Sequence, residues 1–380
     1  DLDYHLRRVR VSSGGQWDDV LEFARTAAMA DFDRARPLWE FWLLTGLADG
    51  GSAFVTKLHH SLTDGIGGVQ LAALVVDGGS GAVDIGELPD EPIGHRLSSL
   101  RITAHSLADD IRGAFGTVGQ AVSSVPRHVL RGVRDPLDEM RSGLRTVTSV
   151  GRFVAPATGD SSVMGRRDIG RRLVTFDVAF DDLHAAAHAA GCHLNDAYLA
   201  ALADGVGRYH DRHGEYLRDV HVTVPVSIRR KRDAIGGNRI TLTRVSLRGH
   251  IDDPIRRMQH IAGVMQRWRH EPALAYTQEI AFGMNLVPRA YLGGMFKRME
   301  LVASDVPGIP QPVWLAGAKL TGYYGFGPTI GAAFNSTLMS YAGTCNIGVN
   351  IDTSAVSDPD DLIACLQAAF SDVLAVAAAS

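Results

Sequence analysis

The stretch that decides the fold is Lys57-Leu58-His59-His60-Ser61-Leu62-Thr63-Asp64-Gly65-Ile66-Gly67-Gly68. Two adjacent histidines stand where a predicted strand, residues 52–58, ends and a polar turn begins. Successive side chains of a strand point to opposite faces, so His59 and His60 are not expected to share one role. Histidine is a natural general base because its unperturbed pKa, about 6.5, lies close to physiological pH.

The residues after the histidines favour a tight turn into a helix, predicted over 66–76. Asp64 is placed to cap that helix by accepting its free N–H groups, and Gly65 lets the backbone turn sharply. A His-x-x-x-Asp spacing alone occurs by chance in many proteins, and a zinc site is an alternative. Zinc-binding histidines on one helix face usually stand four residues apart, as in HExxH, which is not the spacing here. Ser61 and Thr63 lack the strand–turn–helix GxSxG setting of a serine hydrolase.

Strands and helices alternate on both sides of this segment, which predicts an α/β protein with two unlike halves. A hairpin is expected to join strands 37–44 and 52–58 across the glycines at 46–51. Further strands are predicted over 172–178, 220–228, 240–247 and within 299–351, and helices over 17–30, 180–190, 195–209, 253–269, 275–298 and 359–377.

Three regions are expected along the chain. Residues 1–95 form an N-terminal subdomain, residues 96–170 a helical linker that is rich in arginine, and residues 171–380 a C-terminal subdomain. Residues 163–172, across the boundary between the linker and the C-terminal subdomain, are expected to be a mobile loop.

The composition excludes several classes of protein. The 380 residues are 46% hydrophobic and 21% charged, enough to bury a large core. The formal net charge of −4 shows no basic excess, so no nucleic-acid partner is expected. Three scattered cysteines, Cys192, Cys345 and Cys365, argue against a disulfide framework and a structural zinc site, and for a reducing compartment. No apolar run approaches about 20 residues, so no transmembrane helix is expected.

HHSLTDG matches HHxxxDG, the signature of the chloramphenicol acetyltransferase-like superfamily. Further segments, in the right order over nearly the whole chain, resemble the bacterial wax ester synthase/diacylglycerol acyltransferase family. They are Phe32–Trp39 (its PLW segment), Asn195-Asp196 (ND), Pro225–Arg229 with Gly237-Asn238 (PVSxR…GN), Ser304–Gly308 with Leu315–Ala318 (SNVPGP…LAGA) and Ser340–Gly343 (SYxG).

Two departures from the family pattern stand out. Ser304-Asp305 replaces the Ser-Asn of SNVPGP, which could alter a turn or a local hydrogen bond. The opening residues, Asp1–His5, resemble an internal family segment, so the family's first strand and helix are expected to be absent from this sequence.

The resemblance implies two chloramphenicol acetyltransferase-like subdomains with mixed sheets and an active-site channel between them. It implies an O-acyltransferase that moves a fatty acyl group from acyl-CoA to a long-chain alcohol or a diacylglycerol through a ternary complex. His60 would be the general base, Asp64 would hold the turn, and Asn195 would stabilise the oxyanion. For Asn195, a helix cap is the structural alternative. The residues expected to support the site structurally are His59, Gly65 and Asp196.

The resemblance implies no metal and no cofactor, with acyl-CoA as co-substrate. The basic run Arg229–Arg232 could pair with the phosphates of coenzyme A, but a solvated face is favoured, so no residue is assigned to them. The arginine-rich residues 96–152 favour a cytoplasmic protein that binds peripherally to a membrane or to lipid bodies. An ordinary surface helix is the alternative there.

Three other functions remain open. The first is a condensation-type or polyketide-associated acyltransferase, against which the PLW and ND segments count. The second is a non-catalytic, lipid-binding family member, disfavoured because His60 and Asp64 are both present. The third is a metal hydrolase.

Overall fold

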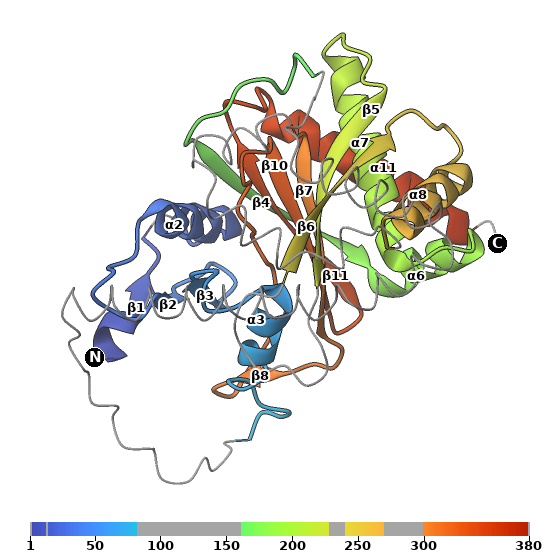
Figure 1. The fold of residues 1–380 in the computed structure, drawn as a ribbon. Helices are drawn as coiled ribbons and strands as arrows, with labels where there is room; N and C mark the ends of the chain where they lie inside the picture. Colours follow the sequence, from blue (N-terminus) through green and yellow to red (C-terminus); the bar gives the residue numbers. More distant parts are fainter. Residues whose placement is uncertain (1, 13, 82–160, 228–239, 270–298, 379–380) are drawn as a thin grey trace, which may run out of the picture. The chain divides into compact units, whose positions relative to one another are not determined.

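The computed structural model describes residues 2–12, 14–81, 161–227, 240–269 and 299–378. Its strands form a three-stranded sheet, a six-stranded sheet and a two-stranded sheet (Figure 1). The two larger sheets each contain parallel and antiparallel pairs, so the prediction of an α/β fold with mixed sheets is confirmed. The predicted division into 1–95, 96–170 and 171–380 stays a prediction, because residues 82–160 lie outside those described.

The three-stranded sheet belongs to the first half of the chain and has the order β1-β2-β3. β2 and β3 are antiparallel, which confirms the predicted hairpin, whereas β1 pairs with β2 in parallel. The sequence did not predict β1 or the short helix α1 before it. The bounds are α1 (Leu2–His5), β1 (Leu6–Arg10), β2 (Trp39–Thr45) and β3 (Ser52–Leu58).

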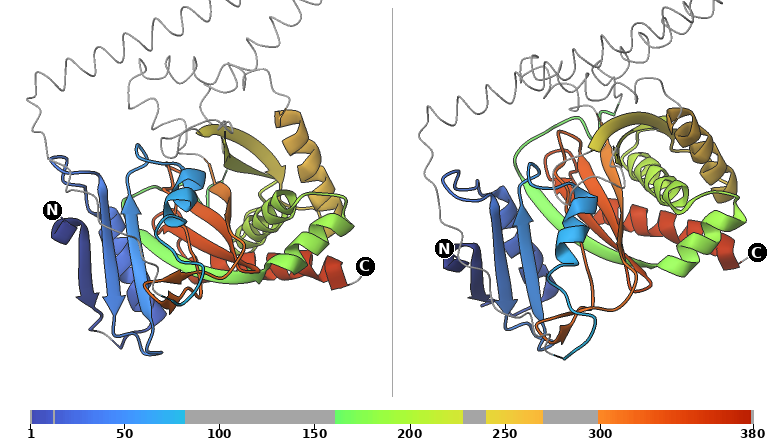
Figure 2. Two further views of the ribbon diagram at one scale, coloured as in Figure 1. Left: turned by 90° about the horizontal axis from the view of Figure 1, so that it is seen from below. Right: turned by 60° about the horizontal axis from the view of Figure 1, so that its bottom comes forward.

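One face of this sheet is covered by helix α2 (Trp17–Met29), as Figure 2 shows. Val20 of the helix packs against Trp42 and Leu44 of β2 in a small apolar core. Along β2, buried and half-buried residues alternate, as expected for a strand covered on one side.

The six-stranded sheet has the order β4-β11-β10-β7-β5-β6. β7 runs parallel to both of its neighbours, and the other pairs are antiparallel. The three strands predicted in this half over 172–178, 220–228 and 240–247 are confirmed in outline, as are strands within 299–351. The bounds are β4 (Arg171–Ala179), β5 (Asp219–Ser227), β6 (Ile240–Arg248), β7 (Leu301–Ile309), β10 (Phe334–Tyr341) and β11 (Thr344–Asp352).

Four helices pack on one face of the six-stranded sheet, and together they form the main apolar core (Figures 1 and 2). The helix predicted over 275–298 lies outside the described residues. Among the described helices, the last one is long and apolar enough to cross a membrane by length and composition, but its apolar residues belong to this core. The helices are α6 (Phe180–Ala189), α7 (Leu194–Arg212), α8 (Pro254–Arg269) and α11 (Pro359–Ala378).

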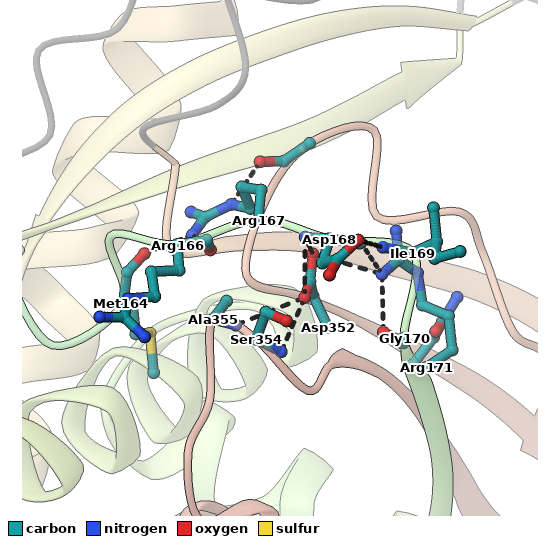
Figure 3. Close-up of polar contacts among 12 residues, drawn as sticks. Met164, Arg166, Arg167, Asp168, Ile169, Gly170, Arg171, Asp352, Ser354 and Ala355 are labelled. Atoms are coloured by element: carbon teal, nitrogen blue, oxygen red, sulfur yellow. Dashed lines mark hydrogen bonds and ion pairs between the residues drawn. The ribbon is translucent and has the colours of Figure 1, made fainter.

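A buried carboxylate fixes the segment that leads into β4 (Figure 3). Asp352, at the end of β11, accepts backbone N–H groups from Asp168 at 3.0 Å and Ser354 at 3.0 Å. It also forms an ion pair with Arg171 at 3.2 Å. Nearby, Arg167 donates to the carbonyls of Gly331 and Met299. Residues 163–172 were expected to be a mobile loop; residues 163–170 are irregular but held by hydrogen bonds to the C-terminal half, and Arg171 begins β4.

Candidate active site

The HHSLTDG segment forms the turn between β3 and helix α3 (Gly65–Ala72). Backbone hydrogen bonds hold the turn: the His59 N–H donates to Leu38 O at 3.0 Å, and the Leu62 N–H donates to His59 O at 2.9 Å. Asp64 is only 2% exposed, and its Oδ1 accepts the Gly67 N–H at 2.8 Å. The prediction that Asp64 caps the following helix is confirmed.

The two histidines have different surroundings. The Nδ1 atom of His59 lies 2.7 Å from the Ser61 hydroxyl and accepts the Ser61 N–H at 3.1 Å, so this ring is part of the turn. The His60 ring is exposed, and it makes no hydrogen bond with any residue that the structure describes. Both rings are exposed, and of the two only the His60 ring is without a hydrogen bond to a described residue.

The start of α3 packs directly on β7. A Cβ atom added to Gly65 would lie 3.0 Å from Cγ2 of Val306. Val306 belongs to the Ser304–Gly308 segment that resembles SNVPGP. The HHSLTDG turn and this segment, far apart in the sequence, are therefore in contact.

Asn195 lies in the first turn of α7 and is half-buried. The cap of this helix is His193, whose backbone N–H donates to Asp196 Oδ2 at 3.0 Å. The alternative that Asn195 serves as the helix cap is therefore wrong. Its amide makes no hydrogen bond with another described residue.

The direction of α7 follows from its contacts with the sheet. The Tyr198 hydroxyl donates to Ser336 Oγ on β10 at 2.8 Å, and both residues are fully buried. At the other end of α7, the Tyr209 hydroxyl accepts the Asp358 N–H at 3.4 Å, just beyond β11. Because the end of β11 lies beside the start of β10, α7 runs antiparallel to β10.

Asn195 consequently lies near the level of Asp305 on β7. It precedes Tyr198 by one helical turn, about 4.5 Å along the axis. Ser336, the partner of Tyr198, pairs with Ala303, and Asp305 follows Ala303 on the same strand face. That face carries the main core, to which Ala303 and Tyr198 belong. Val306 points to the opposite face, so the Tyr198 contact of α7 and the Gly65 contact of the HHSLTDG turn lie on opposite faces of the sheet.

The carboxylate of Asp305 has an unusual environment. The side chain is exposed and has no hydrogen-bond partner among the described residues, yet the protein around it limits its hydration. This desolvation raises the pKa of Asp305 to about 6. Burial also raises the pKa of the Cys345 thiol to about 12, and the charge of Asp305 adds to that effect. The departure from the family pattern at Asp305 thus places a carboxyl group at the point where the motifs meet.

Other family-like segments support β7. The Gly308 N–H donates to Ser340 Oγ at 3.1 Å, and a Cβ atom on Gly308 would lie only 2.0 Å from Ser340 O. Ala316 and Gly317, both with positive φ, turn the chain between β8 (Trp314–Leu315) and β9 (Ala318–Lys319). The SYxG and LAGA resemblances therefore correspond to packing and turn positions.

Sequence reasoning missed Tyr198 and Ser336. Tyr198 stands three residues after Asn195, on the same helix face, which was the available signal. The basic run 229–232 and Gly237-Asn238 lie outside the described residues. In the part of the chain that is described, no three His, Cys, Asp or Glu side chains are grouped closely enough to hold a metal ion.

The chain matches two family models: the wax ester synthase/diacylglycerol acyltransferase catalytic domain over residues 1–198, and the C-terminal domain of the same family over residues 236–373. A Mycobacterium tuberculosis protein named as a candidate diacylglycerol O-acyltransferase is 34% identical over 380 residues, covering 99% of this chain and 77% of that protein. A second M. tuberculosis protein of similar name is 31% identical over 388 residues, covering 98% of this chain and 81% of that protein.

Solved structures share the fold. The wax ester synthase/diacylglycerol acyltransferase from Marinobacter aquaeolei VT8 superposes with a TM-score of 0.64 at 21% identity, covering 100% of this chain and 81% of that one. The starter condensation domain of rhizomide synthetase, in complex with C8-CoA and Leu-SNAC, superposes with a TM-score of 0.54 at 17% identity, covering 99% and 77%. The family models, the relatives and the ordered motifs around β7 agree: the chain is an acyltransferase of the wax ester synthase/diacylglycerol acyltransferase family.

Proposed function

We propose that this acyltransferase moves a fatty acyl group from acyl-CoA to the hydroxyl of a long-chain alcohol or a diacylglycerol, with His60 as general base. The observation that carries the proposal is the convergence on β7. The turn that presents the His60 ring packs on Val306 of β7, and the helix that presents the Asn195 amide is joined to the neighbouring strand β10 by the Tyr198–Ser336 hydrogen bond. The mycobacterial relatives named for diacylglycerol support this choice of acceptor.

The proposed reaction has two steps. His60 Nε2 takes the proton of the acceptor hydroxyl while the oxygen attacks the thioester carbonyl carbon, which gives a tetrahedral oxyanion. The carbon–sulfur bond then breaks, and the protonated His60 returns its proton to the departing coenzyme A thiolate. The products are an ester and free coenzyme A, and no acyl-enzyme forms.

The remaining residues position these groups. The Asn195 amide, which makes no hydrogen bond with described residues, can donate to the oxyanion, where such a donor is worth about 10²–10³ in rate. Asp64 fixes the turn by capping α3 and is a positioning residue. Asp196 fixes the first turn of α7 in the same way, through the His193 N–H.

The co-substrate and location complete the proposal. Acyl-CoA is the only co-substrate, without a metal or a further cofactor, and a condensation domain with the same fold has been solved with C8-CoA. We place the reaction in the cytoplasm, at the surface of a membrane or lipid body, because the products are lipids and the sequence over 96–152 is basic and partly apolar.

A condensation-type reaction is the second candidate, favoured by the structural match to condensation domains. Such an enzyme would use an acyl group or acceptor held on a carrier protein. The two functions are separated by supplying free acyl-CoA and a free alcohol, which a carrier-dependent enzyme would not use.

The test measures coenzyme A release from palmitoyl-CoA by purified protein, with hexadecanol or dipalmitoylglycerol as acceptor. His60→Ala is expected to lower acceptor-dependent release by about 10²–10⁴-fold, the usual contribution of a general base. His59→Ala is the matched control, because it removes the same ring from the adjacent position; a loss below about tenfold is expected from its turn contacts alone. Near wild-type release by His60→Ala, with the fold intact, would contradict the proposal.

A further inference from the structure

Helix α2 is tied to the six-stranded sheet at its first residue. The indole Nε1–H of Trp17 donates to Thr175 Oγ1 on β4 at 2.7 Å. The Trp17 ring also packs against the Tyr324 ring, with 5.6 Å between the two centroids. The Tyr324 hydroxyl donates to the carboxylate of Asp177, which lies two residues after Thr175 on the same face of β4. The start of α2 is therefore anchored on β4.

The other end of α2 is tied to the strand that leads into the HHSLTDG turn. The Lys57 ammonium, near the end of β3, donates to Ala30 O, the C-terminal cap of α2, at 2.6 Å. The same ammonium lies 4.1 Å from the centroid of the Phe32 ring, and that ring meets the His59 ring edge-on at 5.9 Å. Lys57 precedes His60 by three residues, so this end of α2 is anchored beside the HHSLTDG turn.

Between these two anchors α2 is a rigid strut. Its 13 residues span about 20 Å at about 1.5 Å per residue. Val20 holds the helix against β2 and β3, because it shares the small apolar core with Trp42 and Ala53. A shift of α2 along β4 would consequently be passed to the end of β3 and to the histidines that follow it.

We propose that Trp17 and Lys57 are positioning residues, which hold α2 between β4 and the HHSLTDG turn and thereby set the place of His60 relative to the six-stranded sheet. The inference rests on the proposed function, in which His60 is the general base, while the Asn195 amide belongs to α7 on that sheet. Both positioning residues act through α2. Their effect on the rate follows because a misplacement of about 1 Å can cost about 10²-fold.

The experiment measures kcat and KM for palmitoyl-CoA, with hexadecanol or dipalmitoylglycerol as acceptor, in variants of both anchors. Lys57→Met keeps the length of the side chain but loses the donor to Ala30 O, and Trp17→Phe keeps a ring but loses the N–H group. Each is expected to lower kcat by about 10-fold. KM should change by less than about twofold, because the general base is displaced and the binding of acyl-CoA is not. Lys57→Arg keeps a cationic donor and should restore most of kcat.

The two anchors act through one helix, so their effects should not add. The double variant is expected to lose about as much kcat as the slower single variant, whereas independent effects would multiply. Arg25→Gln is the matched control, because it removes a cation from the middle of α2, where Arg25 pairs with Glu22 of the same helix. It should leave kcat unchanged. Melting curves give the folded fraction at the assay temperature, to which each kcat is normalised.

Thr175→Val removes the same hydrogen bond from the β4 side with little change in volume, and it carries the test if Trp17→Phe or Lys57→Met does not fold. It should lower kcat as Trp17→Phe does. Unchanged kcat in these variants, a rise in KM in its place, multiplied losses in the double variant, or a Lys57→Arg protein as slow as Lys57→Met would overturn the inference alone. Acceptor-dependent release that His60→Ala leaves intact would instead overturn the proposed function, and this inference with it.

Discussion

Gly65 and Val306 are in contact where α3 meets β7, and a methyl group on Gly65 would lie 3.0 Å from Cγ2 of Val306. This contact joins two of the segments that resemble the family, HHSLTDG and Ser304–Gly308, and it fixes where the HHSLTDG turn meets the sheet. The tightness of the contact can be measured by adding a methyl group at residue 65 and then shortening the side chain at residue 306.

Gly65→Ala is expected to destabilise the protein through overpacking, which costs about 1–3 kcal/mol, partly offset by the better helix propensity of alanine, about 1 kcal/mol. In the background of Val306→Ala the space is free, so the same change should be neutral or stabilising. A double-mutant cycle of urea unfolding should give a coupling of at least about 1 kcal/mol. Additive effects of the two changes would show that the contact is not tight.

Asp64→Ala should lower both stability and activity, because it removes the acceptor for the Gly67 N–H at the start of α3. The loss of an N-cap costs about 0.5–2 kcal/mol. Asp64→Ser keeps a cap oxygen and should recover most of the unfolding free energy. Thermal unfolding and coenzyme A release are measured together, and an inactive but fully stable Asp64→Ala would point to a direct chemical role for the carboxylate.

Tyr198→Phe should destabilise the protein by about 1–3 kcal/mol, because it leaves the buried Ser336 hydroxyl without its donor. Ser336→Ala should then cost little in the background of Tyr198→Phe, because both partners are already gone. The same variants should lower kcat, since the hydrogen bond holds the α7 turn that follows Asn195. Equal losses for Ser336→Ala in both backgrounds would refute this coupling.

Asp305 should make stability depend on pH. Its pKa is raised from 3.8 to about 6, so over that window the folded protein binds more protons than the unfolded chain, and stability falls as the pH rises. Asp305→Asn lacks this effect. The melting temperature of the variant minus that of the wild type should therefore be greater at pH about 7.5 than at pH about 5. A difference that is constant across this range would show that the Asp305 carboxylate is well hydrated.

Asp352→Asn should be among the more costly single changes in the C-terminal half. The Asp352 carboxylate is 2% exposed and accepts several N–H groups. An asparagine amide would turn its own N–H group toward one of these donors. The unfolding free energy is expected to fall by about 1–3 kcal/mol. Asp360→Asn breaks an ion pair whose carboxylate is 77% exposed and should cost less than about 1 kcal/mol. Similar melting temperatures for both variants would contradict this ranking.

The predictions that succeeded from sequence rest on short-range contacts. Asp64 accepts from Gly67, three residues later, so its role as a cap could be recognised from the local pattern. The strand 52–58 and the hairpin before it were predicted with their observed pairing for the same reason.

The parts that the sequence did not reveal depend on distant partners. The hydrogen bond from Tyr198 to Ser336 joins residues 138 positions apart, and no periodicity marks it. β1 was missed because it pairs in parallel with β2, across the intervening helix α2, and its own sequence is mostly charged. The raised pKa of Asp305 arises from the protein packed around β7, which exists only in the folded chain.

The pairing of β4 with β11 also has a consequence for how the protein is made. The strand that opens the six-stranded sheet has the last strand as its neighbour, so it stays unpaired on the ribosome until residues near Asp352 have been synthesised. During that interval α7 lacks the part of its apolar core that β11 supplies, because α7 and β11 share one core. Nascent chains that stall before β11 are therefore the species most exposed to aggregation, and the ones that chaperones must protect.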